Sequence, residues 1–439
     1  MKKFLHTSLA AIVGMAMLQL FFAPVILRAQ VSGNDRGMAL GLLDMTKDTI
    51  KKNYYDPTYH GVDLDFVFDQ AKERMKAAPT RDALMLTIAS AVLTLDDSHT
   101  TFLPPVRAAE VEYGWTAAVI GDDVYIQRVK PGSDAEAKGL KPGDRLLAID
   151  GFRPTRKNLW QMSYRYFVVA PTARVNMTIL SPDDEKPRSL MVETKIKKTA
   201  GTISVQEWYD RGVIKHGWDD SQKIFEYQQF GNDLLIWKMH TFSVEQDNLD
   251  NAITRARNAK TLIIDLRDNG GGSVDILKRM VGFFFDKEIK VFDEKRRKET
   301  KSLMAKPQSN IFKGELIVVV GQESASASEV FSRIIQLEKR GKIIGDKTMG
   351  AVMESQLHEL NGGIGSNLFA GATVTLADLV MSDGQSLEKV GVTPDVTILP
   401  TGKDLAEGKD PVLAYAAKLA GVELTPEKAG TFFPFEWPK

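Results

Sequence analysis

The sequence predicts a multidomain α+β protein, and three residue patterns along its 439 residues indicate the order of its parts. Apolar residues recur at helical spacing from about residue 37 to residue 95. Short apolar runs separated by Pro-Gly turns occupy residues 106–198. After residue 199, continuous apolar runs typical of strands buried on both faces alternate with helical patterns. We therefore expect a helical region, a small β-rich domain and an α/β core.

The composition excludes several classes of protein and of chemistry. Hydrophobic residues make up 43% of the chain and charged residues 26%, which is ordinary for a globular protein and unlike a disordered one. The chain has 57 basic and 57 acidic residues, so we expect no nucleic-acid partner. The absence of cysteine excludes disulfides, cysteine-ligated metals and a thiol nucleophile. With only six histidines, a catalytic imidazole has few sources.

Residues 1–29 are predicted to be a signal peptide or an anchor. A basic start at residues 1–3 precedes an apolar run at residues 4–27, and Ala29 follows, which is typical of an export signal. The run is long, and Leu27 stands where a small residue is usual. An uncleaved membrane tether by residues 4–27 is therefore the alternative. Either interpretation places the protein outside the cytoplasm, in the periplasm or the extracellular space.

Residues 30–105 are predicted to form a helical N-terminal domain. Leu42, Leu43 and Ile50 belong to one apolar stripe, and similar spacing continues to about residue 95. The segment ends at the sequence DDSHTT, residues 96–101, just before two prolines.

The turns of residues 106–198 follow one another at distinctive offsets. A strand leads to a Pro-Gly turn at residues 131–132, and a short helix leads to the sequence GLKPGD at residues 139–144 before another apolar strand. This order resembles a PDZ domain, a fold that binds an extended peptide by adding it as a strand to a sheet edge. The resemblance implies protein or peptide substrates that dock here; a spacer of the same fold that binds no peptide is the alternative.

Residues 199–439 are predicted to form an α/β core with a C-terminal tail. Strands are expected at residues 234–237, 261–266 and 316–320 and from residue 343, with helices between them and one more at about residues 411–419. This alternation favours a mostly parallel sheet, whose functional loops lie beyond the carboxyl ends of the strands.

Two of these strand-to-helix junctions carry the residues that acyl transfer requires. Residues 268–272 read DNGGG, which lets bare backbone amides approach a ligand. Residues 324–328 read SASAS, which places hydroxyls where a helix begins. An acyl-transfer site combines a nucleophile with amides that stabilise an oxyanion. A simple helix cap is the alternative for the serines, and a tight turn or anion cradle for the glycines.

The two junctions, a GDKTMG segment at residues 345–350, the PDZ-like domain and the export signal together resemble the C-terminal processing (tail-specific) and tricorn-core serine proteases. The resemblance spans nearly the whole mature chain. It implies a serine endopeptidase with a crotonase-like (ClpP/crotonase-type) core, no cofactor, and a PDZ domain that engages the substrate.

The base that activates the serine divides this family. In tail-specific proteases the segment after the GDKTMG-type stretch reads Gly-Lys-Gly and the lysine is the base, but here Gly350 is followed by Ala351 and Val352. The tricorn-type branch uses a histidine preceded by serine, with a glutamate before a Gly-Val-x-Pro-Asp motif. This chain has Ser98-His99, and Glu388 before GVTPD at residues 391–395. The chain is therefore closer to the Ser-His branch.

The resemblance assigns roles to these residues. Ser326 is the expected nucleophile and His99 the base, supported by Ser98 or Glu388, with Glu354 as the rival of Glu388.

The amides of Gly271 and Ala327 are the expected oxyanion-hole donors, with Gly270 or Gly272 as alternatives to Gly271. The remaining histidines, His60, His216, His240 and His358, lack metal-ligand spacing, so we expect no metal. A catalytically silent peptide-binding protein and a retinoid- or lipid-binding module with this core are the competing hypotheses.

Overall fold

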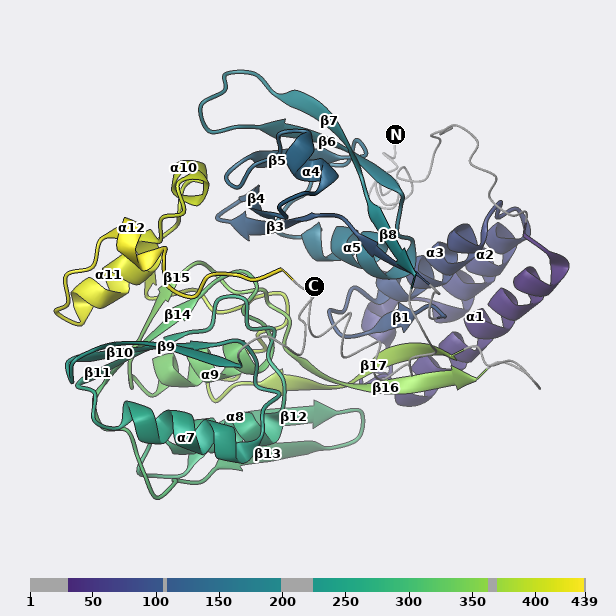
Figure 1. Ribbon diagram of the computed structural model, residues 1–439. Coiled ribbons are helices and arrows are strands. Elements are labelled where there is room, and N and C mark those ends of the chain that lie inside the picture. The colour runs from purple at the N-terminus through teal and green to yellow at the C-terminus, as the bar shows by residue number, and fades with distance from the viewer. Residues whose placement is uncertain (1–30, 106–108, 199–223, 362–368, 438–439) are drawn as a thin grey trace, which may run out of the picture.

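The computed structural model describes residues 31–105, 109–198, 224–361 and 369–437 (Figure 1). The segment predicted to be a signal peptide or anchor lies outside these ranges. No helix within them is long and apolar enough to cross a membrane. The described chain has a helical N-terminal region, an antiparallel β domain and a core with a mostly parallel sheet, which confirms the predicted mixed fold class.

The N-terminal region consists of three helices, α1 (Gly33–Asn53), α2 (Leu64–Lys76) and α3 (Arg81–Val92), with short 3-10 turns at Tyr59–Gly61 and Leu93–Leu95. Each helix begins after a residue whose side chain accepts a backbone N–H of the first turn: Ser32, Asp63 and Thr80. The chain then leaves the helices in a loop and enters the short strand β1 (Thr101–Leu103). That loop carries Ser98 and His99.

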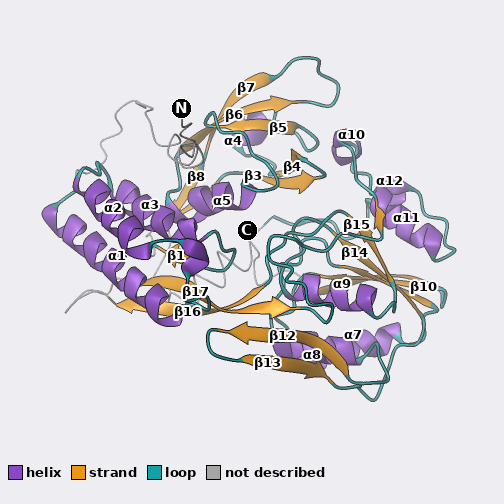
Figure 2. Cartoon of the chain, turned by 180° about the vertical axis from the view of Figure 1, so that it is seen from behind, coloured by secondary structure: helices purple, strands orange, loops and turns teal. Residues whose placement is uncertain are grey.

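A second sheet fixes these helices to the core. It has the order β1-β17-β12-β13, and β16 also pairs with β17. The long hairpin of β16 (Met353–Asn361) and β17 (Phe369–Val380) extends from the core to the helices (Figure 2). Apolar side chains of β17 and β16 complete the buried cluster of α1–α3. The other two strands are β12 (Ile289–Arg296) and β13 (Thr300–Ala305).

The middle domain is a five-stranded antiparallel sheet with a buried cluster of its own. Its strands are β3 (Trp115–Ile120), β4 (Asp123–Val129), β5 (Arg145–Ile149), β6 (Arg174–Leu180) and β7 (Arg188–Glu193). Helix α4 (Asp134–Ala137), helix α5 (Leu159–Ser163) and a π-helical turn (Tyr164–Val169) accompany the sheet. Strands β2 (Ala109–Glu112) and β8 (Lys195–Lys198) pair where the chain enters and leaves the domain.

The core sheet has the order β18-β15-β14-β11-β10-β9 and is parallel except where β9 joins β10. Its strands are β9 (Phe225–Phe230), β10 (Leu234–Met239), β11 (Thr261–Asp265), β14 (Glu315–Val320), β15 (Lys342–Gly345) and β18 (Val396–Thr397). Successive side chains point to opposite faces, as Trp237 and Ile236 do. Both faces are buried, which explains the continuous apolar runs.

Helices cover the two faces of the core sheet. The face that includes Trp237 packs against α7 (Gln246–Ala256), α8 (Val274–Gly282) and α9 (Ala327–Leu337). The face that includes Ile236 packs against α11 (Pro411–Leu419) and α12 (Pro426–Ala429), and the short α10 (Gly402–Ala406) precedes them. The loops that follow β11 and β14 therefore emerge together at one edge of the sheet, because neighbouring parallel strands share their carboxyl end.

The middle domain rests on the core through polar contacts. Arg156 donates to the Asp346 carboxylate at 2.7 Å and to the Lys347 carbonyl at 2.9 Å. Arg128 lies 3.3 Å from Asp268, and the ring of Phe435 from the C-terminal tail lies 4.1 Å from the Arg128 guanidinium carbon. The domain therefore contacts loops of the core that are close to the predicted site.

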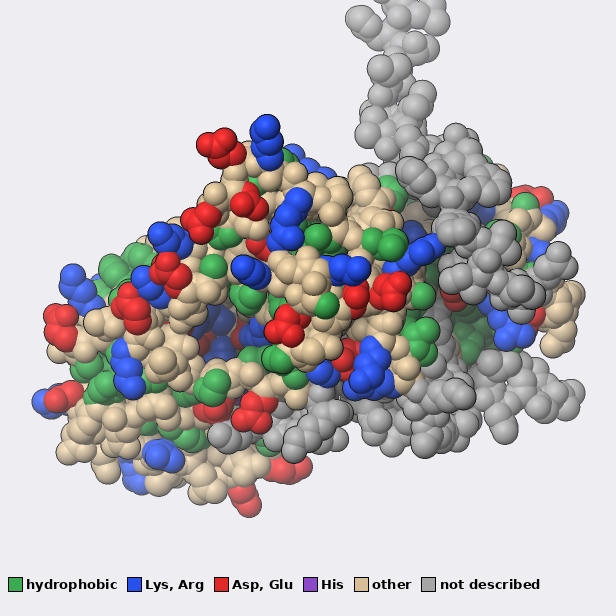
Figure 3. All heavy atoms as spheres, turned by 45° about the horizontal axis from the view of Figure 1, so that its top comes forward, with side chains coloured by type: hydrophobic (Ala, Val, Ile, Leu, Met, Phe, Trp, Pro, Cys, Tyr) green, Lys and Arg blue, Asp and Glu red, His purple; other side chains and the backbone are tan. Residues whose placement is uncertain are grey.

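On the face shown in Figure 3, acidic and basic side chains intermingle over the described surface.

Candidate active site

Ser326 lies in a strained turn between β14 and α9. Its backbone angles are φ 54° and ψ −118°, a combination that costs a non-glycine residue about 1–3 kcal/mol. Ser273, at the equivalent place before α8, has ordinary extended angles of −62° and 128°. A strained strand-to-helix turn is typical of a nucleophilic serine that is held out of its helix. Ordinary helix capping therefore does not account for the conformation of Ser326.

Backbone and carboxylate acceptors hold this turn in place. The N–H of Ser326 donates to the carbonyl of Ala351 at 2.9 Å and to the carboxylate of Glu329 at 3.1 Å. Ala351 belongs to the segment that follows β15, so the turn is tied to a neighbouring loop rather than to its own helix alone.

The glycine loop after β11 lies against Ser326. Gly271 has φ 96°, and a Cβ added there would lie 2.7 Å from the Cβ of Ser326 and 2.9 Å from the N of Ala327. Only glycine allows both this backbone conformation and this close approach. The sequence-predicted glycine loop and serine turn are therefore brought together.

The candidate oxyanion amides differ in their present partners. The Gly271 N–H donates to Asn269 Oδ1 at 2.9 Å. Within the described ranges, the amides of Ala327, Gly270 and Gly272 have no hydrogen-bond acceptor. Ala327 is buried and directly follows Ser326, so its amide is free to face an oxyanion.

His99 lies in the loop after α3 and is fixed by a buried aspartate. The Asp97 carboxylate accepts the N–H of His99 at 2.7 Å and the N–H of Thr100 at 3.1 Å. It also accepts the hydroxyl of Thr375 on β17, which ties the loop to the second sheet. Burial lowers the pKa of His99 below its ordinary value, and the Asp97 charge opposes that shift. His99 is therefore held largely neutral at pH 7, as a general base must be.

Ser98 lies between His99 and Glu388. Its hydroxyl lies 2.7 Å from His99 Nδ1 and 2.8 Å from Glu388 Oε2, and its N–H donates to Glu388 Oε1 at 3.0 Å. Glu388 Oε2 also accepts the Val352 N–H at 2.9 Å. Burial, and next the charge of Asp97, raises the pKa of Glu388 to about 7, while the bonds from Ser98 and Val352 oppose the shift.

The two halves of the site meet in adjacent residues of one segment. Ala351 bonds to the Ser326 amide, and Val352 bonds to the Glu388 carboxylate. The structure describes both His99 and Ser326 and shows no hydrogen bond between these two side chains. The Ser326 turn and the Glu388 carboxylate are thus both tied to the two residues that precede β16.

Models of two protein families match parts of the chain. Residues 233–398 match the model of peptidase family S41, and residues 111–180 match the PDZ domain model. The chain therefore contains a region of peptidase family S41, over residues 233–398. It is a serine peptidase, and the middle domain, whose strands β3–β6 the second match covers, is its PDZ domain.

Relatives of the peptidase are named for C-terminal processing. The carboxyl-terminal-processing protease of Picosynechococcus is 25% identical over 362 residues, which are 80% of each chain. Carboxyl-terminal-processing peptidase 2, chloroplastic, of Arabidopsis thaliana is 26% identical over 364 residues, which are 79% of this chain and 66% of that one.

Solved structures with a similar fold span most of the peptidase. Mature CPAF superposes with a TM-score of 0.63 at 15% identity, over 85% of this chain and 95% of that one. The photosystem II D1 C-terminal processing protease superposes with a TM-score of 0.53 at 19% identity, over 89% and 99% of the two chains. These likenesses confirm the predicted fold of the core together with the PDZ domain.

The rival glutamate lies elsewhere in the peptidase. Glu354, on β16, forms an ion pair with Arg296 at 2.8 Å. Burial, and next a hydrogen bond with Glu294, raises its pKa to about 7. Of the two glutamates, only Glu388 contacts Ser98.

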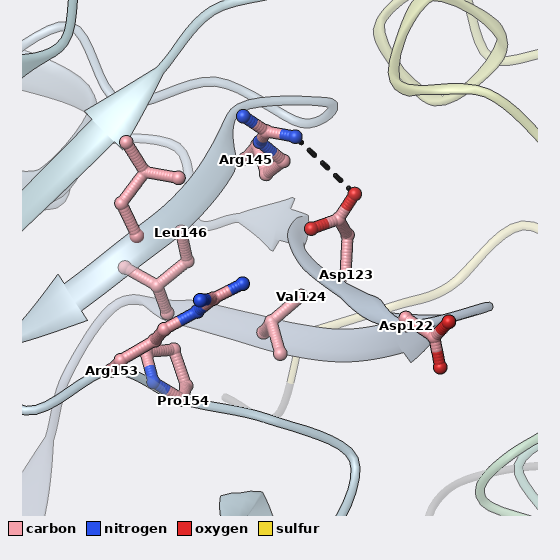
Figure 4. Close-up of a pocket in the computed structure, with 8 residues that line it drawn as sticks. Asp122, Asp123, Val124, Arg145, Leu146, Arg153 and Pro154 are labelled. Atoms are coloured by element: carbon pink, nitrogen blue, oxygen red, sulfur yellow. Dashed lines mark hydrogen bonds and ion pairs between the residues drawn. The ribbon is translucent and has the colours of Figure 1, made fainter.

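Two of the other described histidines have side-chain partners other than Ser326. His60 bonds to Tyr55 and to the Leu95 carbonyl in the 3-10 turn after α3, and His240 lies 3.1 Å from Glu226. No group of three His, Cys, Asp or Glu side chains in the described part of the peptidase could hold a metal ion. The pocket in Figure 4 lies in the PDZ domain beside the Asp123–Arg145 ion pair and includes none of the predicted catalytic residues.

Sequence reasoning missed three buried polar residues of the site: Asp97, Asn269 and Glu329. Asp97 precedes the Ser-His pair, and Glu329 stands three residues after Ser326, where a glutamate commonly caps a helix start. The capping pattern was a signal for Glu329, but its role depends on amides from a distant loop that the pattern does not include.

Proposed function

We propose that the protein is an exported serine endopeptidase in which Ser326 attacks the peptide carbonyl and His99 is the general base. The observation that supports this most is the hydrogen-bond chain from Glu388 through Ser98 to His99. This chain meets the Ser326 turn at Ala351 and Val352.

The charge of Glu388 sets the tautomer of His99. An ionised carboxylate only accepts hydrogen bonds, so the Ser98 hydroxyl donates to Glu388 and its oxygen accepts from His99 Nδ1–H. The lone pair of His99 then lies on Nε2, the nitrogen left for Ser326. A protonated Glu388 donates to Ser98 instead, which turns the Ser98 proton toward Nδ1 and leaves the proton of the ring on Nε2.

Hydrolysis follows in two steps. Nε2 of His99 takes the Ser326 proton as Oγ bonds to the carbonyl carbon, and the oxyanion is stabilised by the Ala327 amide and an amide of the glycine loop. His99 returns the proton to the leaving amine, and water attacks the acyl-enzyme with His99 again as base. Proton transfer requires a separation of at most about 3.2 Å, so the base and the nucleophile close together when substrate binds.

Substrates are proteins or peptides that dock on the PDZ domain, and no cofactor takes part. We divide the chain into residues 1–29 as export signal, 30–105 as the helical domain, 106–198 as the PDZ domain and 199–439 as the catalytic core with its tail. An uncleaved residue 4–27 segment would instead tether the enzyme to the membrane.

The test is cleavage of an unfolded reporter protein by purified variants. Ser326→Ala is expected to abolish cleavage, and His99→Ala to reduce it by at least about 1,000-fold. Ser302→Ala, on the exposed β13, and His60→Ala serve as matched controls and are expected to cleave at the wild-type rate.

A catalytically silent peptide-binding protein is the second candidate. Two observations favour it: Ala351 occupies the segment where tail-specific proteases carry their lysine, and His99 and Ser326 are not hydrogen-bonded. A folded wild-type protein that binds the reporter without cleaving it would establish this alternative.

A further inference from the structure

A buried carboxylate without a role in the mechanism above lies beneath the Ser326 turn. Glu329, in the first turn of α9, has no exposed surface. Among the described residues no cation pairs with it, and its pKa is raised to about 7 chiefly by burial. A carboxylate buried in this way needs a compensating set of hydrogen bonds.

Four donors from two separate segments supply that compensation. Oε2 accepts the N–H groups of Ser326 at 3.1 Å and Ala351 at 2.9 Å. Oε1 accepts the Thr348 hydroxyl at 2.5 Å and the Gly350 N–H at 2.7 Å. One side chain therefore binds both the nucleophile turn and the loop that follows β15.

We propose that Glu329 is the positioning residue that sets the register of the nucleophile turn against the Gly350–Val352 segment. The proposal rests on the proposed function, because it gives Glu329 its importance through Ser326. Glu329 touches neither substrate nor the reacting atoms, and its effect passes through Ser326 and Ala351.

The geometry explains why such a residue is needed. The Ser326 backbone is strained at φ 54°, so the turn relaxes unless its N–H is held. Ala351 is held by Glu329 on one side, and Val352, its neighbour, is held by Glu388 on the other. The two glutamates thereby fix the distance between the nucleophile turn and the Ser98–His99 pair, on which the rate of proton transfer depends.

The experiment compares Glu329→Gln with Glu338→Gln, a substitution at the C-terminal cap of the same helix that removes only the ion pair with Lys287. A glutamine has one acceptor oxygen where the carboxylate has two, so some of the four donors lose their partner. We expect kcat to fall about 10- to 100-fold in Glu329→Gln, with KM changed less than about threefold, because one or two bonds to a charged acceptor are lost. Glu338→Gln is expected to retain both constants.

Backbone hydrogen exchange gives a second readout. Segments 321–330 and 346–353 are expected to exchange faster in Glu329→Gln than in Glu338→Gln, while β10 and β11 stay protected. A folded Glu329→Gln with wild-type kcat, or one in which only KM changes, overturns the proposal. Equal losses in the two variants overturn it as well.

Two substitutions of Thr348 test the proposal if Glu329→Gln does not fold. Thr348→Ser keeps the hydroxyl that bonds to Glu329, and Thr348→Val removes it. We expect kcat to fall several-fold in the valine variant only; equal kcat in both overturns the proposal. Failure of the proposed function is distinguishable, because the wild-type protein itself would then be inactive.

Discussion

The acid limb of the pH–rate profile is expected to report the ionisation of Glu388 rather than that of His99. Burial raises the pKa of Glu388 to about 7 and lowers that of His99 below its ordinary value. Only ionised Glu388 orients Ser98 so that His99 presents its Nε2 lone pair. Activity therefore falls as the pH drops through the higher of the two pKa values, which belongs to Glu388.

The size of the effect follows from these shifts. At pH 6 a carboxyl group with a pKa near 7 is only about one-tenth ionised, so kcat/KM is expected to fall about tenfold from its plateau. Glu388→Gln removes this titration and moves the fall in activity to lower pH, where His99 protonates. The plateau of that variant falls about 10- to 150-fold, because a hydrogen bond to a charged acceptor contributes about 1.5–3 kcal/mol.

The assay is kcat/KM between pH 5 and pH 9 with a peptide that has no titrating group in that range. Glu354→Gln is the matched control, because the pKa of Glu354 is also raised to about 7 but its partner is Arg296. In the control, kcat/KM should fall with decreasing pH near pH 7 as it does in the wild type. A Glu388→Gln variant that also keeps a limb near pH 7 would refute the tautomer argument.

Three further perturbations follow from other contacts. Gly271→Ala places a Cβ 2.7 Å from that of Ser326, so kcat/KM should fall by more than about 100-fold. Arg156→Ala removes a half-buried contact to Asp346 worth about 1–3 kcal/mol, so amides at residues 117–123 should exchange about 5- to 150-fold faster. Because the pKa of Glu329 is raised in the folded protein, its protonation stabilises the fold fully below the unfolded pKa of about 4.3. This stabilisation is lost as the pH rises through about 7. Between pH 5 and pH 8 the unfolding midpoint should therefore fall less in Glu329→Gln than in the wild type.

Each of these has a control and a contrary result. Gly151→Ala also has a positive φ but open space around it, and should keep full activity; an active Gly271→Ala would contradict the close packing of the glycine loop. Arg153→Ala, on the exposed rim of the PDZ pocket, should leave exchange unchanged. The stability prediction fails if the unfolding midpoints of the wild type and Glu329→Gln decrease by the same amount between pH 5 and pH 8. Glu338→Gln should behave like the wild type.

The buried core strands were predictable because each is a local pattern. The runs at residues 261–266 and 316–320 became β11 and β14, since burial on both faces requires continuous apolar residues. The hairpins β12–β13 and β16–β17 were not predicted. Strand β16 mixes charged and apolar residues, and the small side chains of β17 pack only because α1–α3 cover them. That partner lies more than 250 residues away, which no local pattern reveals.

The site could be predicted in part for the same reason. Ser326, His99 and Glu388 belong to short motifs that can be found in the sequence. The hydrogen bond between Ser98 and Glu388 agrees with the expectation that these two residues act together. Only the tertiary structure shows that Glu388, and not Glu354, contacts Ser98, because both glutamates follow the nucleophile helix in the sequence and both are half-buried. Asp97 and Glu329 act through backbone amides, whose directions depend on the folded loops and not on residue type.

The most direct test of the account is covalent labelling of the wild-type enzyme with a fluorophosphonate, mapped by mass spectrometry. We predict one modified residue, Ser326, with labelling absent in Ser326→Ala and slowed at least about 100-fold in His99→Ala, since the base activates the nucleophile. Folding of each variant is checked by its thermal unfolding. A folded wild-type protein that is not labelled, or is labelled at another serine, would contradict the assignment of Ser326.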